Sequence, residues 1–210
     1  MARPPPLATR DAAPALERAT LALEAGPRAA ITKWIDLLCA WNARIDLTAA
    51  RSGEELVDLM LADALHLAPR IAAGARVVDV GTGAGAPGLA LAIARPDLAV
   101  TLCEPLAKRA SFLRTVLGTI GRADVAIAGS RGEELGAGRF DVAMSRATLA
   151  PEAWLALGAT LVRPGGDVWV LLARDDAPAR EGVTLAEELA YDWPETLAHR
   201  RAARYVTAEP

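Results

Sequence analysis

The stretch DVGTGAGAPG, residues 79–88, contains a glycine pattern typical of loops that bind a cofactor. Three of its glycines, Gly83, Gly85 and Gly88, fit the spacing G-x-G-x-x-G, the fingerprint of dinucleotide-binding loops. In another frame the run starts at Asp79 and reads D-x-G-x-G-x-G, the pattern of pockets for S-adenosylmethionine (SAM). Both patterns need a loop that follows a strand and opens a helix. The glycines alone therefore leave the ligand open.

The charge of Asp79 favours SAM over a dinucleotide. A dinucleotide would bring its anionic pyrophosphate against this loop and the start of the helix, where a carboxylate would repel it. SAM brings an ammonium and a sulfonium group, both of which a carboxylate attracts. Glu104, which ends the next expected strand, can accept both ribose hydroxyls of either cofactor and does not discriminate. A dinucleotide site and a plain strand-to-helix turn are the alternatives.

Composition limits the classes of protein that can carry this loop. The chain has 210 residues, of which 52% are hydrophobic and 23% charged, as expected for a soluble α/β protein with a full core. Its apolar runs are too short to span a membrane, and its start lacks a secretory signal. Cys39 and Cys103 lie far apart, which indicates reduced thiols and a cytoplasmic protein. The net charge of −3 is not that of a strong general nucleic-acid binder.

The loop needs a sheet to position it, and from Arg76 onward expected strands alternate with helices, which predicts a mainly parallel sheet. The expected strands cover residues 76–80, 99–104, 124–130, 140–146 and 167–173, and the expected helices cover 86–94, 106–120 and 151–162. After Glu181 the pattern weakens, and we expect a helix near 184–190 and a strand near 203–208.

Upstream of the sheet we expect a disordered leader over 1–14, because it is rich in proline, and a helical segment over 15–71 that packs on the α/β domain of 72–210. One helical stripe there has apolar residues at spacings of three and four: Ile31, Trp34, Ile35, Leu38, Trp41 and Ile45. A second helix is expected over 53–69, with Leu56, Leu59, Met60 and Leu67 facing inward.

Several runs together resemble one family. DVGTGAGAPGLALAIARPD, LCEPLAKRASFLRTV, SRGEEL and FDVAMSRA resemble the RsmG (GidB, glucose-inhibited division protein B) methyltransferases, and WNARIDLT resembles that family's W-N-x-x-x-N-L-T segment. The resemblance runs from Trp41 to Arg146. It implies a Rossmann-like class I SAM-dependent methyltransferase fold with an N-terminal helical extension. It also implies methyl transfer from SAM to N7 of a guanine in the decoding-region loop of 16S ribosomal RNA.

The resemblance also assigns roles to residues. It places Gly81 and Ala86 against the donor, Gly132 and Glu133 beside the adenine ring, and Arg146 where cofactor and substrate meet. Together with the loop argument, the predicted cofactor site is Asp79, Gly81, Gly83, Gly85, Ala86, Glu104, Gly132, Glu133 and Arg146. The chain departs from the family pattern at Ala84, Ala86 and Glu104, and on the RNA side at Asp46, Leu59, Met60, Ala173, Arg174 and Asp175.

The expected chemistry needs no general base, because guanine N7 carries a free lone pair. Proximity of that lone pair to the methyl group can suffice, in a pocket for an extruded base. Accordingly, the sequence contains no Ser-His-Asp, HExxH or Cys-His arrangement, and His66 and His199 are expected to be structural or solvated. We expect Arg146 to be the catalytic residue on the substrate side, through guanine O6 or a flanking phosphate. A salt bridge at the strand end is the alternative role.

Further cations can contact phosphates of the RNA: Arg131, Lys108, Arg109 and Arg114, with a basic cluster at 199–205. An ordinary solvated helix face is the alternative for Lys108, Arg109 and Arg114. We therefore expect a cytoplasmic, monomeric enzyme that uses SAM and no metal, acts on 16S ribosomal RNA or the small ribosomal subunit, and has no membrane association. A small-molecule methyltransferase and a non-catalytic relative of the family are the alternative functions.

Overall fold

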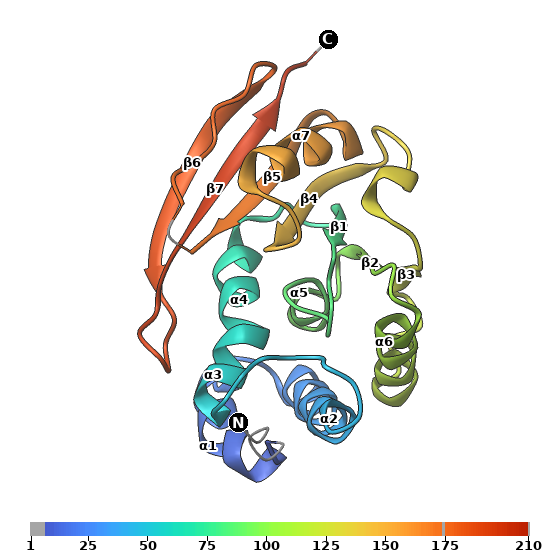
Figure 1. Ribbon diagram of the computed structural model, residues 1–210, viewed down its shortest axis with the longest axis vertical. Helices are drawn as coiled ribbons and strands as arrows, with labels where there is room; N and C mark the ends of the chain where they lie inside the picture. Colours follow the sequence, from blue (N-terminus) through green and yellow to red (C-terminus); the bar gives the residue numbers. More distant parts are fainter. Residues whose placement is uncertain (1–6, 174, 210) are drawn as a thin grey trace.

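The fold is built on a seven-stranded sheet. The computed structural model describes residues 7–173 and 175–209. The strand order is β3-β2-β1-β4-β5-β7-β6, with β1 to β5 parallel and the hairpin of β6 and β7 antiparallel at one edge (Figure 1). The strands are β1 (Arg76–Val80), β2 (Ala99–Cys103), β3 (Ala126–Ala128), β4 (Phe140–Arg146), β5 (Val162–Leu172), β6 (Val183–Asp192) and β7 (His199–Thr207). This is the expected Rossmann-like class I methyltransferase architecture.

Helices cover both faces of the sheet, because the side chains of each strand alternate between two cores. Val77 of β1 belongs to a large core beneath the N-terminal helices, whereas Val78 and Val80 belong to a smaller core. The large core is covered by α1 (Thr9–Thr20), α2 (Ala25–Asn42), α3 (Gly53–Val57), α4 (Asp63–Leu67), α5 (Gly88–Ala94) and α6 (Ala107–Ile120). The smaller core lies under α7 (Pro151–Leu161) (Figure 1).

The apolar stripe of α2 lies where its spacing predicts. Ile31, Trp34, Ile35 and Leu38 are fully buried, and Trp41 is partly buried against the large core, as is Ile45, which lies beyond the end of the helix at Asn42. Trp34 also donates from Nε1 to the carbonyl oxygen of Ala84, 3.0 Å away, in the glycine loop. The N-terminal helices thus support the loop that the sequence singles out.

The chain differs from the sequence-based expectation at its start. Residues 9–14, expected within a disordered leader, lie in α1, because Ala12 and Ala15 bury their small side chains against the core. The rest of that leader up to residue 6 lies outside the described residues. The helix expected over 53–69 is divided into α3, a π-helical turn η1 (Asp58–Ala62), α4 and a 3-10 turn η2 (Ala68–Arg70).

The expectation of a helix near 184–190 is wrong. These residues lie in β6, which pairs along its length with β7, and β7 contains most of the strand expected near 203–208. The run AEELA has high intrinsic helix propensity, but the pairing with β7 and the sheet edge overrides it. Among the described residues, no helix is long and apolar enough to cross a membrane.

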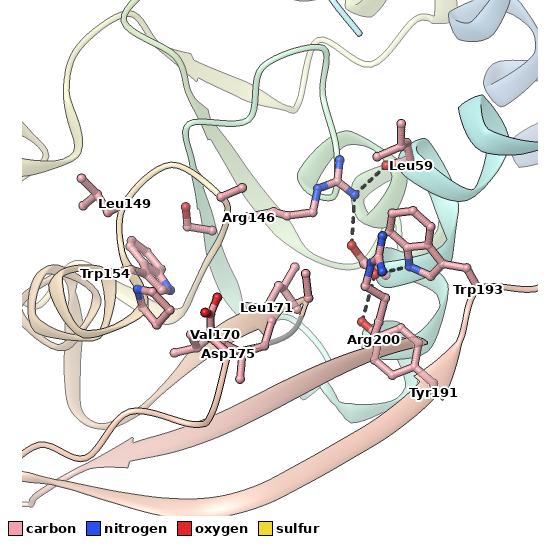
Figure 2. Close-up of a pocket in the computed structure, with 16 residues that line it drawn as sticks. Leu59, Arg146, Leu149, Trp154, Val170, Leu171, Asp175, Tyr191, Trp193 and Arg200 are labelled. Atoms are coloured by element: carbon pink, nitrogen blue, oxygen red, sulfur yellow. Dashed lines mark hydrogen bonds and ion pairs between the residues drawn. The ribbon is translucent and has the colours of Figure 1, made fainter. Parts of the chain in front are cut away.

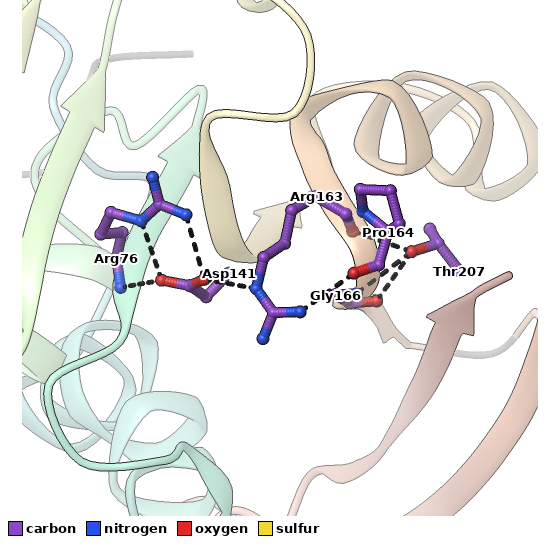
Figure 3. Close-up of polar contacts among 6 residues, drawn as sticks. All are labelled: Arg76, Asp141, Arg163, Pro164, Gly166 and Thr207. Carbon is purple, nitrogen blue, oxygen red and sulfur yellow. Dashed lines mark hydrogen bonds and ion pairs between the residues drawn. The ribbon is translucent and has the colours of Figure 1, made fainter. Parts of the chain in front are cut away.

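One carboxylate aligns the amino ends of the parallel strands. Asp141 of β4 accepts hydrogen bonds from Arg76 of β1, through the backbone nitrogen at 2.8 Å and Nε at 3.0 Å, and from Nε of Arg163 of β5 at 2.7 Å (Figure 3). Thr207 of β7 donates to the carbonyl oxygen of Arg163 and accepts from the backbone nitrogen of Gly166. These contacts set the strand register at the end of the sheet opposite the carboxyl ends, where the candidate site lies.

Candidate functional site

The glycine loop turns sharply between β1 and α5. Gly81, Gly83 and Gly85 have φ angles of +73°, +60° and +112°, a region in which side chains are strained. A Cβ added to Gly81 would also collide with the side chain of Thr148, from the loop after β4. The loop therefore needs its glycines for both conformation and space. The strand–loop–helix context predicted for it is present.

Asp79 lies beneath this loop rather than in front of it. Its side chain is fully buried, and Oδ2 accepts a hydrogen bond from the backbone nitrogen of Gly88 at 2.8 Å, at the start of α5. Oδ1 makes no hydrogen bond with any described residue. Burial raises the pKa of Asp79 to about 6, so the carboxylate is ionised at neutral pH at a cost in free energy. Any attraction of Asp79 for a cationic ligand must act through the loop, not by the direct contact that the sequence suggests.

Glu104 also stabilises the loop. Its Oε2 accepts from the backbone nitrogen of Gly83 at 3.0 Å, and its Oε1 accepts from that of Leu106 at 2.8 Å. Only 2% of the residue is exposed. Each carboxylate oxygen can accept a second bond, so the pairing with ribose hydroxyls that the sequence predicts would use the remaining lone pairs.

A cavity opens beside the loop, at the carboxyl ends of β1 and β2. Its volume is about 450 Å³, within the range of small-ligand pockets. Gly81, Arg131, Gly132 and Glu133 line it, together with Val80, Cys103, Pro105, Leu106, Thr148, Leu149 and Leu157. Of the predicted cofactor residues, Gly83, Gly85 and Ala86 in the turn do not line it, and neither do Asp79, Glu104 and Arg146. We call this space the glycine-loop cavity.

The glycine-loop cavity suits a cationic, nucleoside-bearing ligand. A Cβ on Gly132 would lie 2.8 Å from Val80 and 3.0 Å from Leu157, so only glycine allows the backbone to pack this closely against the apolar side chains of the wall. Glu133 lines the cavity, and the carboxylates of Asp79 and Glu104 lie behind the same loop. Cys103 is a neutral thiol, because burial raises its pKa to about 11. Both cysteines are free, as expected.

A second cavity, of about 280 Å³, lies beside it at the carboxyl ends of β4 and β5. It is lined by residues of β4, β5, α7, the N-terminal helices and the β6–β7 hairpin, including Leu59, Asp63, Arg146, Trp154, Tyr191, Trp193 and Arg200 (Figure 2). We call it the Arg146 cavity. Leu149 lines both cavities, so they are neighbours separated by the loop after β4.

Arg146 is held within this second cavity. Its Nη1 donates to the carbonyl oxygen of Leu59 at 2.6 Å and to Oδ2 of Asp63 at 3.0 Å (Figure 2). The other oxygen of Asp63 accepts from the hydroxyl of Tyr191 at 2.9 Å and from Nε1 of Trp193 at 2.8 Å. The salt bridge that the sequence left as an alternative role is therefore present. The side chain of Arg146 is still 20% exposed.

The sequence did not identify Asp63, Tyr191, Trp193 or Arg200 as individual site residues. Arg200, within the basic cluster of 199–205, lies over the ring of Trp193, 3.8 Å from its centroid. These residues were missed because the sequence did not predict the β6–β7 hairpin. With a helix expected over 184–190, there was no reason to expect the hairpin turn beside β4. The two aromatic residues just before the basic cluster were the available hint.

The predicted phosphate-contacting cations fall into three places. Arg131 lines the glycine-loop cavity. Lys108 and Arg109 line a neighbouring hollow with Arg44, and Leu106 borders both spaces. Arg114 lines a separate hollow on the side of α6 and does not join them.

Neither histidine is among the residues that line the two cavities. His66 packs edge-on against Tyr191, 4.2 Å between ring centroids, and burial lowers its pKa. His199 is exposed and pairs with Asp192 at 2.8 Å. In the part of the chain that the structure describes, no three His, Cys, Asp or Glu side chains gather as metal ligands would. Among the RNA-side departures, Arg174 lies outside the described residues.

Comparison with known proteins identifies related chains. The family model GidB, rRNA small subunit methyltransferase G, matches residues 28–194. The ribosomal RNA small subunit methyltransferase G of Anaeromyxobacter dehalogenans is 36% identical over 200 residues, covering 90% of this chain and 93% of the relative. The protein of that name from Stenotrophomonas maltophilia is 39% identical, covering 82% and 77%.

Solved structures are similar in fold. The Burkholderia thailandensis 1,6-didemethyltoxoflavin-N1-methyltransferase, with bound S-adenosylhomocysteine, superposes with a TM-score of 0.56 at 18% identity, covering 99% of this chain and 94% of that one. At this identity the likeness concerns the fold alone. It agrees with the sheet and helices described above.

Proposed function

Because the chain belongs to the GidB family, it is a SAM-dependent methyltransferase, and we propose that it methylates N7 of a guanine in 16S ribosomal RNA. One observation carries the proposal. Two cavities adjoin at the carboxyl ends of the parallel strands, one lined by the glycine loop and one by Arg146. This edge is where open α/β sheets bind their ligands.

The glycine-loop cavity would hold the cofactor. Gly81 allows close approach of the loop, and Gly132 and Glu133 would border the adenine ring, with Glu104 at the ribose. The carboxylates of Asp79, Glu104 and Glu133 give this region the negative charge that suits a sulfonium and an ammonium group. When bound, SAM supplies an electrophilic methyl group.

The Arg146 cavity would receive the guanine. Its lone pair at N7 is already free, so the protein needs only to orient the base and exclude water. A donor on N7 would block attack, and the guanidinium of Arg146 therefore suits O6 or a flanking phosphate. The neighbouring hydroxyl of Ser145 cannot act as a base toward the substrate, because it is buried and donates to the carbonyl oxygen of Val80 at 2.8 Å.

Local cations would bind the RNA backbone despite the net charge of −3. Arg131, Lys108 and Arg109 lie in or beside the glycine-loop cavity, which adjoins the Arg146 cavity at Leu149. We assign Arg114 no such role. Since one chain supplies both cavities, we propose a monomer, with residues 15–71 serving as the helical extension of a methyltransferase domain over 72–210. We also propose a cytoplasmic location, which the ribosomal substrate of the family supports.

A deletion strain tests this function. Ribosomal RNA from the strain is treated with borohydride and aniline, which cleave at N7-methylguanosine. We expect one cleavage in 16S RNA to disappear and to return when the gene is restored on a plasmid. An unchanged cleavage pattern would contradict the proposal. Turnover of a metabolite without RNA methylation would instead support a small-molecule enzyme.

A further inference from the structure

Asp63 joins three parts of the fold at the wall of the Arg146 cavity. It begins α4 in the N-terminal helices, and it contacts Arg146 at the end of β4 and Tyr191 and Trp193 near the hairpin turn (Figure 2). The residue is 3% exposed. A buried carboxylate is costly unless its lone pairs are used, and here both oxygens have charged or strong donors.

The contacts engage only one nitrogen of Arg146. All hydrogen bonds of its side chain to described residues run from Nη1, to Asp63 and to the carbonyl oxygen of Leu59. A guanidinium carries five N–H donors in a planar fork, and two of them are used by these bonds. The Nε–Nη2 edge makes no hydrogen bond to a described residue, and such an edge can bind two acceptor oxygens side by side.

The π-helical turn places both acceptors. Leu59 lies within η1 (Asp58–Ala62), and Asp63 follows that turn directly. Such turns are rare and occur often at functional sites. Tyr191 strengthens the arrangement from the other side, because burial and the Asp63 carboxylate raise its pKa and keep its hydroxyl a donor. The hairpin thus holds one oxygen of the Asp63 carboxylate, and the other oxygen holds Arg146.

We propose that Asp63 is a positioning residue, which holds Arg146 by Nη1 so that its Nε–Nη2 edge is presented to acceptor oxygens of the RNA substrate. As far as the substrate is concerned, this rests on the proposed function. Asp63 itself does not touch the guanine. A purely structural ion pair would connect the helices to β4 in the same way. Its loss would lower stability but would leave the orientation of Arg146 in the cavity unchanged.

The test compares two buried aspartates one π-turn apart. In Asp63→Asn the ion pair to Arg146 is lost. In the control Asp58→Asn, the affected carboxylate accepts from the backbone nitrogens of Glu195 and Thr196 and anchors the same hairpin, without touching Arg146. Both variants are expected to lose thermal stability. Only Asp63→Asn is expected to lower kcat/KM for 30S subunits, by about 10- to 100-fold, with SAM affinity changed less than twofold.

Two further measurements separate positioning from general damage. The double variant Asp63→Asn with Arg146→Gln should be no worse than Arg146→Gln alone, because the two residues act as a unit. In protein labelled with ¹⁵N-arginine, rotation about the Nε–Cζ bond of Arg146 should be slow in the wild type and in Asp58→Asn, and fast in Asp63→Asn. If Asp63→Asn does not fold, Tyr191→Phe replaces it in the test, because it removes only one donor to Asp63. Its increase in the rotation rate of Arg146 should be smaller.

The outcomes are distinguishable. Unchanged rotation of Arg146 in Asp63→Asn, or equal loss of kcat/KM in Asp58→Asn, would overturn the role of Asp63. A wild-type protein that holds Arg146 rigidly through Asp63 but leaves 30S subunits unmethylated would contradict the proposed function and leave the positioning role standing.

Discussion

Replacing Asp79 by asparagine should stabilise the free protein at pH 8. The amide keeps the shape of the side chain and can still accept from the backbone nitrogen of Gly88. It removes a charge that is fully buried and has one oxygen without a hydrogen bond to any described residue. The perturbation therefore isolates the free-energy cost of ionising Asp79 in the folded state.

The pKa of Asp79 gives the magnitude. Burial raises this pKa from 3.8 to about 6, and the difference of about two units corresponds to about 3 kcal/mol when the group is ionised in both states. A raised pKa in the folded state means that wild-type stability increases as pH falls through 6 toward 4. The advantage of Asp79→Asn should therefore be about 3 kcal/mol at pH 8, or about 6–12 °C in Tm, and below about 1 kcal/mol at pH 4.

Thermal and urea unfolding between pH 4 and 8, without cofactor, measure this difference. Asp124→Asn is the matched control, because Arg122 lowers the pKa of Asp124, whereas burial raises that of Asp79. The change in stability should therefore have the opposite sign: Asp124→Asn should lose stability at high pH. An Asp79→Asn variant that is no more stable than the wild type at pH 8, or whose advantage is independent of pH, would refute the reasoning.

The same variant tests the electrostatic argument for the cofactor. SAM carries a sulfonium charge that S-adenosylhomocysteine lacks, while both carry the ammonium group. If the charge of Asp79 acts through the loop, Asp79→Asn should weaken SAM about tenfold and S-adenosylhomocysteine much less. Wild-type affinity for SAM should likewise fall as pH drops below about 6. Equal losses for the two ligands would show that Asp79 does not act on the sulfonium charge.

Three other substitutions have defined outcomes. Gly81→Ala should weaken SAM at least tenfold in calorimetry, because a methyl group collides with Thr148 at a φ of +73°; unchanged affinity would contradict the assigned cofactor cavity. Arg146→Gln should lower kcat/KM for 30S subunits about 100-fold and leave the affinity for SAM unchanged. An equal loss of kcat/KM and of SAM affinity would show that Arg146 binds the cofactor instead. Asp141→Asn should lower unfolding free energy by about 2 kcal/mol at pH 7, without loss of activity. Since partners such as Arg76 lower the pKa of Asp141, that difference should shrink progressively as pH falls below 4, and an undiminished difference in that range would contradict it.

The parallel part of the sheet could be predicted from the sequence because each of its strands is buried. RVVDV and FDVAMSR are short apolar runs bounded by polar residues, and β1 and β4 have the predicted bounds. The hairpin could not, since β6 is an edge strand with mostly exposed residues and a helix-favouring run of Ala and Glu. Its pairing with β7 is a tertiary effect that local patterns do not contain.

The same distinction applies to the site. The glycine spacing indicated Gly81, and the resemblance to the family indicated Gly132 and Arg146; all three line a cavity. Spacing did not indicate which way the carboxylate of Asp79 points. Nor did it indicate Asp63, which reaches Arg146 only because a π-helical turn and the hairpin bring distant segments together.

The central claim is that this chain places a methyl group on N7 of a guanine in 16S ribosomal RNA, and one measurement tests it most directly. Purified protein is incubated with tritiated SAM and 30S subunits from the deletion strain, and the labelled nucleoside is identified after digestion. We expect about one methyl group per 16S RNA, all of it as N7-methylguanosine, and almost none with Arg146→Gln. Label at another atom, or none in RNA from the wild-type protein, would contradict it.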